Sequence, residues 1–287
     1  MKKALWLLAA LALLAACAPR ITAEPLPGVR VDVPVTVPAP SVPQPGQAQG
    51  QGRGVTAPVV KVLPGNPLPP PGSVFSDDFS AYPTGAVLPV VAPDRYGLLR
   101  TGGDWQKITV EEAFDPTGKL DKAVRLEGGL GEGFLTLGAE DWSDYRVSFR
   151  LKTLEAPYTG SHIRARLFLD GSGSRGLEFF LGRDPIRGVG LYKLAGNQRI
   201  LLLQRRQLDP VAEAVLRDKN WHDFAFELRG DGTVRAFVDQ TEVLSWKDPD
   251  YNRGGFGIAP GDVTFQLDDL RVERLDNTAP PSSPTGG

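Results

Sequence analysis

Apolar and polar residues alternate one by one along several stretches of the chain between residues 74 and 276. Val147, Phe149 and Leu151 alternate with arginines and a serine, and residues 162–169, 177–181 and 224–228 repeat the pattern. A period of two places successive side chains on opposite faces of an extended strand, so each stretch predicts a strand with one buried face. Runs rich in Gly, Pro and Asp separate the stretches and predict tight turns between antiparallel strands.

Only one segment of this region has a helical pattern. Residues 209–219 combine helix-forming residues with Asp209 as the expected N-cap and Pro210 at the first helical position. Strands do not alternate with helices, and no repeat of fixed length is present. The sequence therefore predicts an all-β antiparallel sandwich. At about 200 residues, the region is long enough for one core of that kind.

The N-terminal residues have the organisation of an export signal. Two lysines precede an apolar stretch from Ala4 to Ala16, which is too short to span a bilayer as a permanent helix. The stretch ends in Leu-Ala-Ala-Cys, which resembles the lipobox of bacterial lipoproteins, where the cysteine receives a diacylglycerol. Cys17 is the single cysteine of the chain, so we expect it to be lipidated, with residues 1–17 as signal peptide and lipobox. The alternative is an ordinary signal peptide cut at an Ala-x-Ala site.

Lipidation of Cys17 implies an exported protein that is held at a membrane by acyl chains, without a transmembrane helix. Ala18, rather than an aspartate, follows the cysteine. In lipoproteins of bacteria with two membranes, this resemblance implies the outer membrane. In other bacteria it implies the cell surface.

The composition changes after the lipobox. Residues 18–73 contain many prolines, a Gln/Gly-rich run and no aromatic residue, so they lack the side chains of a core. We expect a disordered tether that acts either as a spacer away from the membrane or as simple filler. Residues 277–287 are also rich in proline and are expected to be a disordered tail.

Six short motifs in the predicted sandwich carry a family resemblance. They lie at residues 75–80, 142–149, 190–193, 221–224, 234–239 and 265–272. Their order and spacing resemble the concanavalin A-like lectin/glucanase superfamily, in particular its laminin-G-like and keto-disaccharide hydrolase-like branches. The resemblance covers residues 74–276. It implies a jelly roll of two curved antiparallel sheets, adjacent first and last strands, and a concave face that often holds sugars.

The last predicted strand contains a change of phase. Phe265 and Leu267 share one face, whereas Leu270 and Val272 lie in the opposite phase, which predicts a β-bulge at Asp268. The family's glucanases carry a structural calcium whose aspartate matches Asp268, and the first strand would bring Asp78 close. We therefore expect a structural Ca²⁺ with Asp78 and Asp268 as ligands. The alternative is a solvated strand end, with these carboxylates paired to Arg271 or Arg274.

The sequence does not favour an enzyme. The Glu-x-Asp-x-x-Glu motif of the related glucanases is absent, so the paired carboxylates that glycoside hydrolysis requires are not in evidence. The two histidines, His162 and His222, are accompanied by no Gly-x-Ser-x-Gly motif, and zinc ligands are too few. Activity of the keto-sugar hydrolase type stays open, because that branch offers no motif to check.

A binding surface is the better candidate. The non-core phase of three successive strands carries a mixture of charged and aromatic side chains: Arg164, Arg166, Phe168, Glu178, Phe180 and Tyr192. Exposed aromatic clusters usually mark contact with a ligand, so we expect these residues to line a carbohydrate-binding groove. The alternative is that a loop covers this face.

The charge balance limits the partners. A net charge of −2 and the absence of basic blocks argue against nucleic-acid binding, and no glycine-rich phosphate loop supports a nucleotide. Three functions remain, in decreasing order. They are non-catalytic binding of a glycan or envelope polymer, hydrolysis of a glycoside or keto-sugar, and structural or adhesive binding of another envelope protein.

Overall fold

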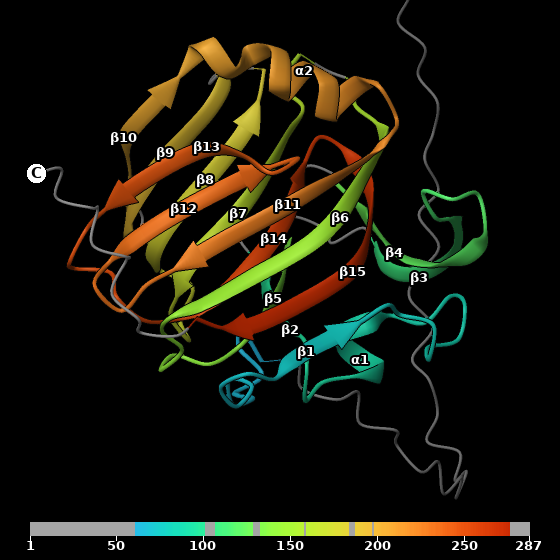
Figure 1. The fold of residues 1–287 in the computed structure, drawn as a ribbon, viewed down its shortest axis with the longest axis horizontal. Helices are drawn as coiled ribbons and strands as arrows, with labels where there is room; N and C mark the ends of the chain where they lie inside the picture. The colour runs from blue at the N-terminus through green and yellow to red at the C-terminus, as the bar shows by residue number, and fades with distance from the viewer. Residues whose placement is uncertain are drawn as a thin grey trace, which may run out of the picture. The chain divides into compact units, whose positions relative to one another are not determined.

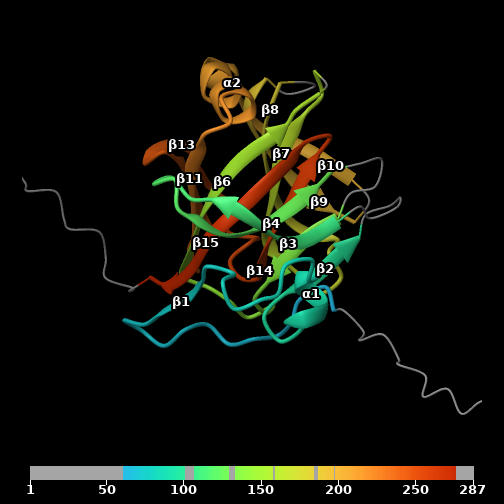
Figure 2. The same cartoon turned by 90° about the vertical axis from the view of Figure 1, so that its right-hand side faces the viewer.

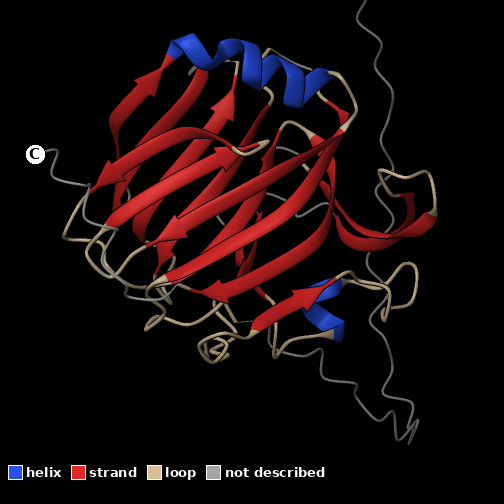
Figure 3. Ribbon diagram, in the orientation of Figure 1, coloured by secondary structure: helices blue, strands red, loops and turns tan. Residues whose placement is uncertain are grey.

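The computed structural model describes residues 61–100, 107–128, 133–157, 159–183, 187–196 and 198–275. The expected signal peptide, Cys17 and the expected C-terminal tail lie outside these residues. The described residues form an antiparallel jelly-roll β-sandwich, which confirms the predicted fold class (Figures 1 and 3). No helix in this part of the chain is long and apolar enough to cross a membrane.

One layer is an eight-stranded sheet. Seven of its strands follow the spatial order β13 (Thr241–Lys247), β12 (Thr233–Val238), β11 (Trp221–Leu228), β6 (Tyr145–Glu155), β15 (Thr264–Arg274), β4 (Leu120–Glu127) and β3 (Lys107–Phe114). The eighth strand, β1 (Val74–Asp77), also pairs with β15. The first and last strands are therefore adjacent, as the family resemblance implied.

The other layer is a seven-stranded sheet. Its spatial order is β10 (Gln198–Arg205), β9 (Gly188–Ala195), β8 (Arg175–Gly182), β7 (His162–Leu169), β14 (Gly255–Gly261), β5 (Gly133–Leu137) and β2 (Gly97–Arg100). The alternating stretches of the sequence coincide with β6, β7, β8 and β11, so the period of two correctly indicated strands.

Phenylalanine rings meet in the core between the sheets, among buried leucines and valines. Phe149 stacks on Phe224 at 5.6 Å between ring centroids, and Phe179 meets Phe226 edge-on at 5.1 Å. Offset and edge-to-face ring pairs add to the free energy gained from burying apolar area. The two sheets are thus joined through side chains that the sequence placed in the buried phase of each strand.

The helical segments are short. They are α1 (Leu88–Val91), a 3₁₀ turn η1 (Arg206–Leu208) and α2 (Asp209–Arg217). α2 buries Ala212, Val215 and Leu216 against the sandwich, and it lies at the end opposite β1 and α1 (Figure 2). The helix was expected, but Asp209 is not its N-cap. Because η1 leads directly into α2, Asp209 already has helical dihedrals, and Leu208 takes the cap position.

The ordered domain starts before the expected boundary at residue 74. Residues 61–66, which we call the strap, lie on the seven-stranded sheet. Leu63 is only 8% exposed, the Leu98 N–H donates to the Lys61 carbonyl at 2.8 Å, and the Trp142 Nε1–H donates to the Asn66 carbonyl at 2.8 Å. Part of the segment expected to be disordered therefore belongs to the folded domain.

Candidate functional site

The face predicted to form a sugar groove is the outer face of the seven-stranded sheet, and most of it is buried. Arg164 and Glu178 have no exposed surface, and Phe168 and Phe180 are only 2% exposed. Arg166 is buried as well, and only Tyr192 is partly exposed. The expectation of exposed aromatic residues on this face is therefore wrong.

Ionic and aromatic contacts fill this face. Arg166 Nε lies 2.7 Å from Glu178 Oε2, and Arg199 forms an ion pair with the other carboxylate oxygen of Glu178. The guanidiniums of Arg164 and Arg166 lie 5.1 and 4.8 Å from the ring centroid of Phe134 on β5. These arginines therefore serve the packing of the face, whereas an open groove would need them to face solvent.

The strap explains part of the coverage. Leu63 forms a second small apolar cluster with Leu99, Phe134, Leu169 and Ala259, on the side of the sheet away from the main core. At the other side of the face, His162 stacks on Phe180 at 4.4 Å between ring centroids. Alternation marks which side chains share a face, but it carries no information about a covering segment from elsewhere in the chain.

Phe168 leaves this face altogether because β7 contains a bulge. Gly255 pairs with Leu169 and Phe256 pairs with Leu167, so Phe168 is the extra residue, and its φ is +54°. The bulge turns the ring into the main core and brings Leu169 to the outer cluster. Positive φ is strained for an aromatic residue, and such strain is concentrated at functional sites.

Gly254 makes this bulge possible. Its φ is +141°, and a Cβ at this position would lie 2.4 Å from the carbonyl carbon of Phe168. Only glycine tolerates both the dihedral angle and the close approach. The loop before β14 therefore holds the bulge in place, and the same loop forms part of the cavity described next.

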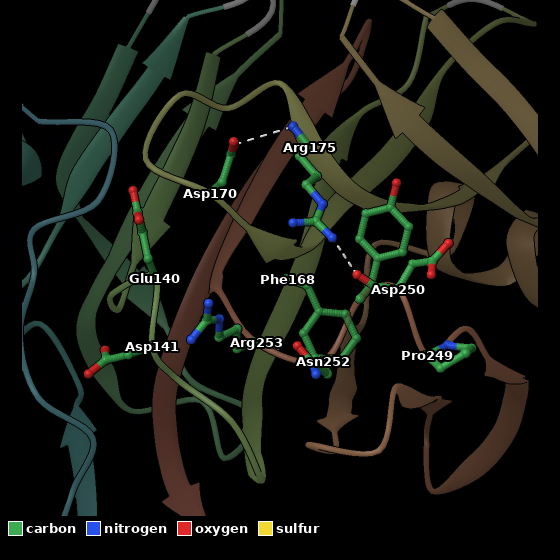
Figure 4. A pocket seen from close by; sticks show the side chains of 10 residues that line it. Glu140, Asp141, Phe168, Asp170, Arg175, Pro249, Asp250, Asn252 and Arg253 are labelled. Carbon is green, nitrogen blue, oxygen red and sulfur yellow. Dashed lines mark hydrogen bonds between the residues drawn. The ribbon is translucent and has the colours of Figure 1, made fainter.

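The candidate site is a cavity of about 600 Å³ at the end of the sandwich opposite α2 (Figure 4). Three loops form it, namely those between β5 and β6, between β7 and β8, and between β13 and β14. The lining residues are Glu140, Asp141, Phe168, Asp170, Arg175, Pro249, Asp250, Tyr251, Asn252 and Arg253. Phe168 and Tyr251 are the buried aromatic residues of the lining, and the other side chains are mostly polar.

Hydrogen bonds between the loops hold the cavity open. Glu140 Oε1 accepts a hydrogen bond from the Gly171 N–H at 2.9 Å, which joins the first two loops. Arg175 Nη2 donates to the Asp250 carbonyl at 2.5 Å, which joins the second loop to the third. The Arg175 guanidinium also lies 5.2 Å from the ring centroid of Tyr251. The walls are thus fixed before any ligand arrives.

Lys193 supports the third loop from β9. Its Nζ lies 3.1 Å from Asp250 Oδ2 and 3.3 Å from Asp248 Oδ2. Hydrogen bonds to Asp250 and Asp248 raise the pKa of this lysine above its ordinary value. The Asp250 carboxylate is therefore neutralised by a permanent cation.

Three polar side chains of the lining are free to bind a ligand. Asp141, Asn252 and Arg253 are exposed, and none has a hydrogen-bond or ion-pair partner among the described residues. Figure 4 shows Arg253 between the loop of Glu140 and Asp141 and the ring of Phe168. The set offers a carboxylate, an amide and a guanidinium on rigid supports, which suits a ligand with many hydroxyl groups.

Of the residues that line the cavity, the sequence predicted only Phe168 as a site residue. The run Asp-Pro-Asp-Tyr-Asn-Arg at 248–253 has the composition of a loop, which is a usable signal. Loop residues carry binding sites more often than strand residues do. Their proximity to residues 138–141 follows only from β14 lying between β7 and β5.

The expected calcium ligands do not form a cluster. The predicted bulge is confirmed, since the register of β15 against β6 shifts between Asp268 and Arg271, and Asp269 has a φ of +48°. Asp268 is buried, and its Oδ2 accepts from Arg150 Nη2 at 3.2 Å. Burial is the main cause that raises the pKa of Asp268 to about 6.

Asp78 lies near Asp269, which follows Asp268 in β15. Asp78 and Asp269 line one hollow, and Asp78 Oδ1 accepts hydrogen bonds from the Ser80 N–H and hydroxyl. Within the described residues, no group of three or more His, Cys, Asp or Glu side chains could hold a metal ion. Arg150, rather than Arg271 or Arg274, is the cation that pairs with Asp268 and Asp269. Calcium binding stays a prediction, and we derive nothing from it.

Comparison with known proteins does not assign the chain to a family. No protein-family model and no curated protein matches the sequence. Similar solved structures include a carbohydrate-binding module from Bacillus subtilis, with 16% identity, a TM-score of 0.43, and coverage of 63% of this chain and 97% of that chain.

Two further structures are similar at the same level. A β-glucanase from Bacillus licheniformis has 14% identity and a TM-score of 0.41, with coverage of 71% of this chain and 99% of that chain. A cellulose-induced protein has 14% identity and a TM-score of 0.47, with coverage of 69% and 96%. At such identities and TM-scores, none of these likenesses supports a conclusion about this chain.

Proposed function

We propose that the protein is an exported lipoprotein whose sandwich binds carbohydrate, without catalysis, in the loop cavity. The observation that carries the proposal is the convergence on a preformed cavity of three polar side chains, Asp141, Asn252 and Arg253, which have no partner within the described part of the chain. The strained aromatic Phe168 lies in the same lining. Preformed cavities of about 300–1,000 Å³ with a few convergent polar groups are typical of small-molecule sites.

The chemistry of the lining favours a hydroxyl-rich ligand. Carboxylates accept hydrogen bonds from sugar hydroxyls, while the amide and the guanidinium donate to sugar oxygens. Hydrogen bonds to charged groups each contribute about 1.5–3 kcal/mol. A purely apolar ligand would bind poorly, because it would remove water from the charged side chains of the lining without offering them a partner.

The test is glycan-array screening followed by titration calorimetry with the full chain in detergent. We expect Arg253→Ala and Asn252→Ala each to weaken binding of the selected glycan by roughly tenfold. Arg206→Ala is the matched control, because Arg206 is exposed in η1 at the opposite end of the sandwich. Unchanged glycan affinity in both cavity variants would reject the cavity as the binding site. Release of reducing ends from the glycan would show that the protein hydrolyses the glycan and would reject non-catalytic binding.

The lipid anchor is a separate part of the proposal. It is supported by the apolar leader and by the position of the single cysteine, Cys17. We expect mass spectrometry of the N-terminal peptide to show acyl chains on Cys17, and Cys17→Ser to release the protein from the membrane fraction. An unmodified Cys17 in the membrane-bound protein would contradict the anchor without affecting glycan binding.

A further inference from the structure

Two hollows lie side by side on the outer face of the eight-stranded sheet. The first measures about 290 Å³ and is bordered by residues of β6, β11, β12 and β15. The second measures about 300 Å³ and lies where β1 meets β15. Asp269 and Arg271 border both hollows, and we call the two hollows together the trough.

The trough runs across the strands. Figure 1 shows β12, β11, β6, β15 and β1 in the layer that faces the viewer. Neighbouring strands of a sheet lie about 4.8 Å apart, so these five strands span about 19 Å. A depression of that length suits a segment of a linear polymer better than a single small molecule.

The floor of the trough is one row of paired residues. Ser76 pairs with Arg271, Arg271 with Ser148, Ser148 with Ala225, and Ala225 with Phe237. Residues directly opposite each other on neighbouring strands project from the same face. Three of the five side chains are small, and this makes the row lower than its neighbours.

The rows on either side form the walls. One wall contains Arg146, whose Nη1 lies 2.9 Å from Glu227 Oε1. The other contains Arg150, which pairs with Asp269 and lies 3.2 Å from Asp268 Oδ2. These guanidiniums are already neutralised by carboxylates and are not available as anion sites.

Arg271 differs from the other arginines of the trough. Its side chain is exposed at the point where the two hollows meet, and it has no hydrogen-bond or ion-pair partner among the described residues. The hydroxyls of Ser76 and Ser148, which flank it in register, have no hydrogen-bond partner in this part of the chain either. A planar guanidinium between two hydroxyl donors matches the geometry of a carboxylate.

The opposite end of the trough offers different groups. Asp223 and Gln240 line the first hollow, and neither side chain has a hydrogen-bond partner among the described residues. The charges that line the two hollows balance, with four arginines and four aspartates. Among the described residues, the trough therefore presents one unpaired cation, Arg271, and two unpaired side chains that can bind hydroxyls, Asp223 and Gln240, rather than a general surface for polyanions.

We propose that the trough binds a linear acidic glycan. A uronate carboxylate lies on Arg271 between Ser76 and Ser148, and hydroxyls of the neighbouring sugars bond to Asp223 and Gln240. The site is distinct from the loop cavity and does not depend on the function proposed for that cavity.

The experiment titrates the full chain in detergent with a linear hexasaccharide in which glucuronate alternates with the neutral sugar N-acetylglucosamine. The comparison ligand is the same hexasaccharide after methyl esterification, which removes the carboxylate charge but keeps the chain. We expect binding of the acid and roughly tenfold weaker binding of the ester. Arg271→Gln should abolish this difference, and Ser148→Leu, which fills the floor, should weaken binding of the acid to a similar extent.

Arg206→Gln serves as the control and should leave the affinity for the acidic hexasaccharide unchanged, because Arg206 is exposed in η1 away from the trough. The cavity variant Arg253→Ala tests whether the acidic ligand binds in the loop cavity instead. Melting curves verify that each variant is folded. Equal binding of acid and ester, no binding of the acid by the unmodified chain, or unchanged affinity in Arg271→Gln would overturn the proposal. Loss in Arg253→Ala alone would move the acidic ligand to the loop cavity and overturn it as well.

Discussion

The outer faces of the two sheets carry similar sequences, but their arginine side chains are buried on one face and partly exposed on the other. On β7, Arg164 and Arg166 alternate with apolar residues, and both side chains are buried. On β6, Arg146 and Arg150 alternate with apolar residues in the same way, yet their side chains are 34% and 25% exposed. Identical periodicity therefore does not decide whether the polar face of a strand meets solvent.

The difference comes from what lies beside each strand. The outer face around β7 is closed by the strap, by Phe134 of β5 and by the ion pairs of Glu178. The face around β6 is bordered by charged and small residues of β11 and β15, together with the ring of Phe237 from β12. Burial of charge strengthens each ion pair but makes the loss of one partner far more damaging.

The largest expected effect comes from Glu178→Gln, which removes the carboxylate between Arg166 and Arg199 in the closed face. We expect the free energy of unfolding to fall by about 3–5 kcal/mol in urea titrations, since the buried guanidinium of Arg166 loses its counter-charge. The matched change on the open face is Asp269→Asn, for which we expect less than about 1 kcal/mol. Similar losses of unfolding free energy in both variants would contradict the contrast between the closed and the open face.

The next effect concerns Asp268, a buried carboxylate of the open face. The folded protein raises the pKa of Asp268 to about 6, above the value of an unfolded aspartate, chiefly through burial. A raised carboxyl pKa favours folding at low pH, and this contribution is lost as the pH rises from about 4 to about 6. Asp268→Asn should remove a pH-dependent difference of up to about 3 kcal/mol. Parallel stability–pH curves for the two proteins would contradict this expectation.

The strap provides a third test. Leu63→Ala removes the side chain that joins the strap to the outer cluster, and we expect a loss of about 2 kcal/mol together with faster hydrogen exchange in β2. Leu201→Ala on β10, where the side chain is 48% exposed, should change the stability by less than about 0.5 kcal/mol. If exchange in β2 is unaffected, the strap does not close this face.

The smallest effect is expected at His222. Its Nδ1 lies 2.7 Å from Asp239 Oδ2 and its Nε2 lies 3.0 Å from Asp218 Oδ1. Burial lowers the pKa of this histidine, but the hydrogen bonds to Asp239 and Asp218 outweigh it, and the net pKa is raised.

The protonated histidine therefore stabilises the fold below its unfolded pKa, and this contribution is lost as the pH rises through the folded value. His222→Gln should flatten the stability curve across that range. An NMR titration that finds the pKa of His222 at or below its ordinary value would show that the two carboxylates do not hold it.

Much of the fold followed from the sequence alone. The alternation in β6, β7, β8 and β11, the helix from Asp209 and the bulge at Asp268 are local patterns, because each depends on residues close together in the chain. The adjacency of β1 and β15 came from the family resemblance. Such features are determined by which side chains can share a face with their near neighbours.

The sites were decided by the tertiary structure. The bulge at Phe168 is encoded by Gly254, which lies far along the chain, and the strap that covers Leu99 comes from a segment with the composition of a tether. The loop cavity needs three loops that meet only because β14 lies between β7 and β5. Exposure, ion pairing and cavities depend on contacts between residues distant in sequence, and a periodic pattern contains no information about those contacts.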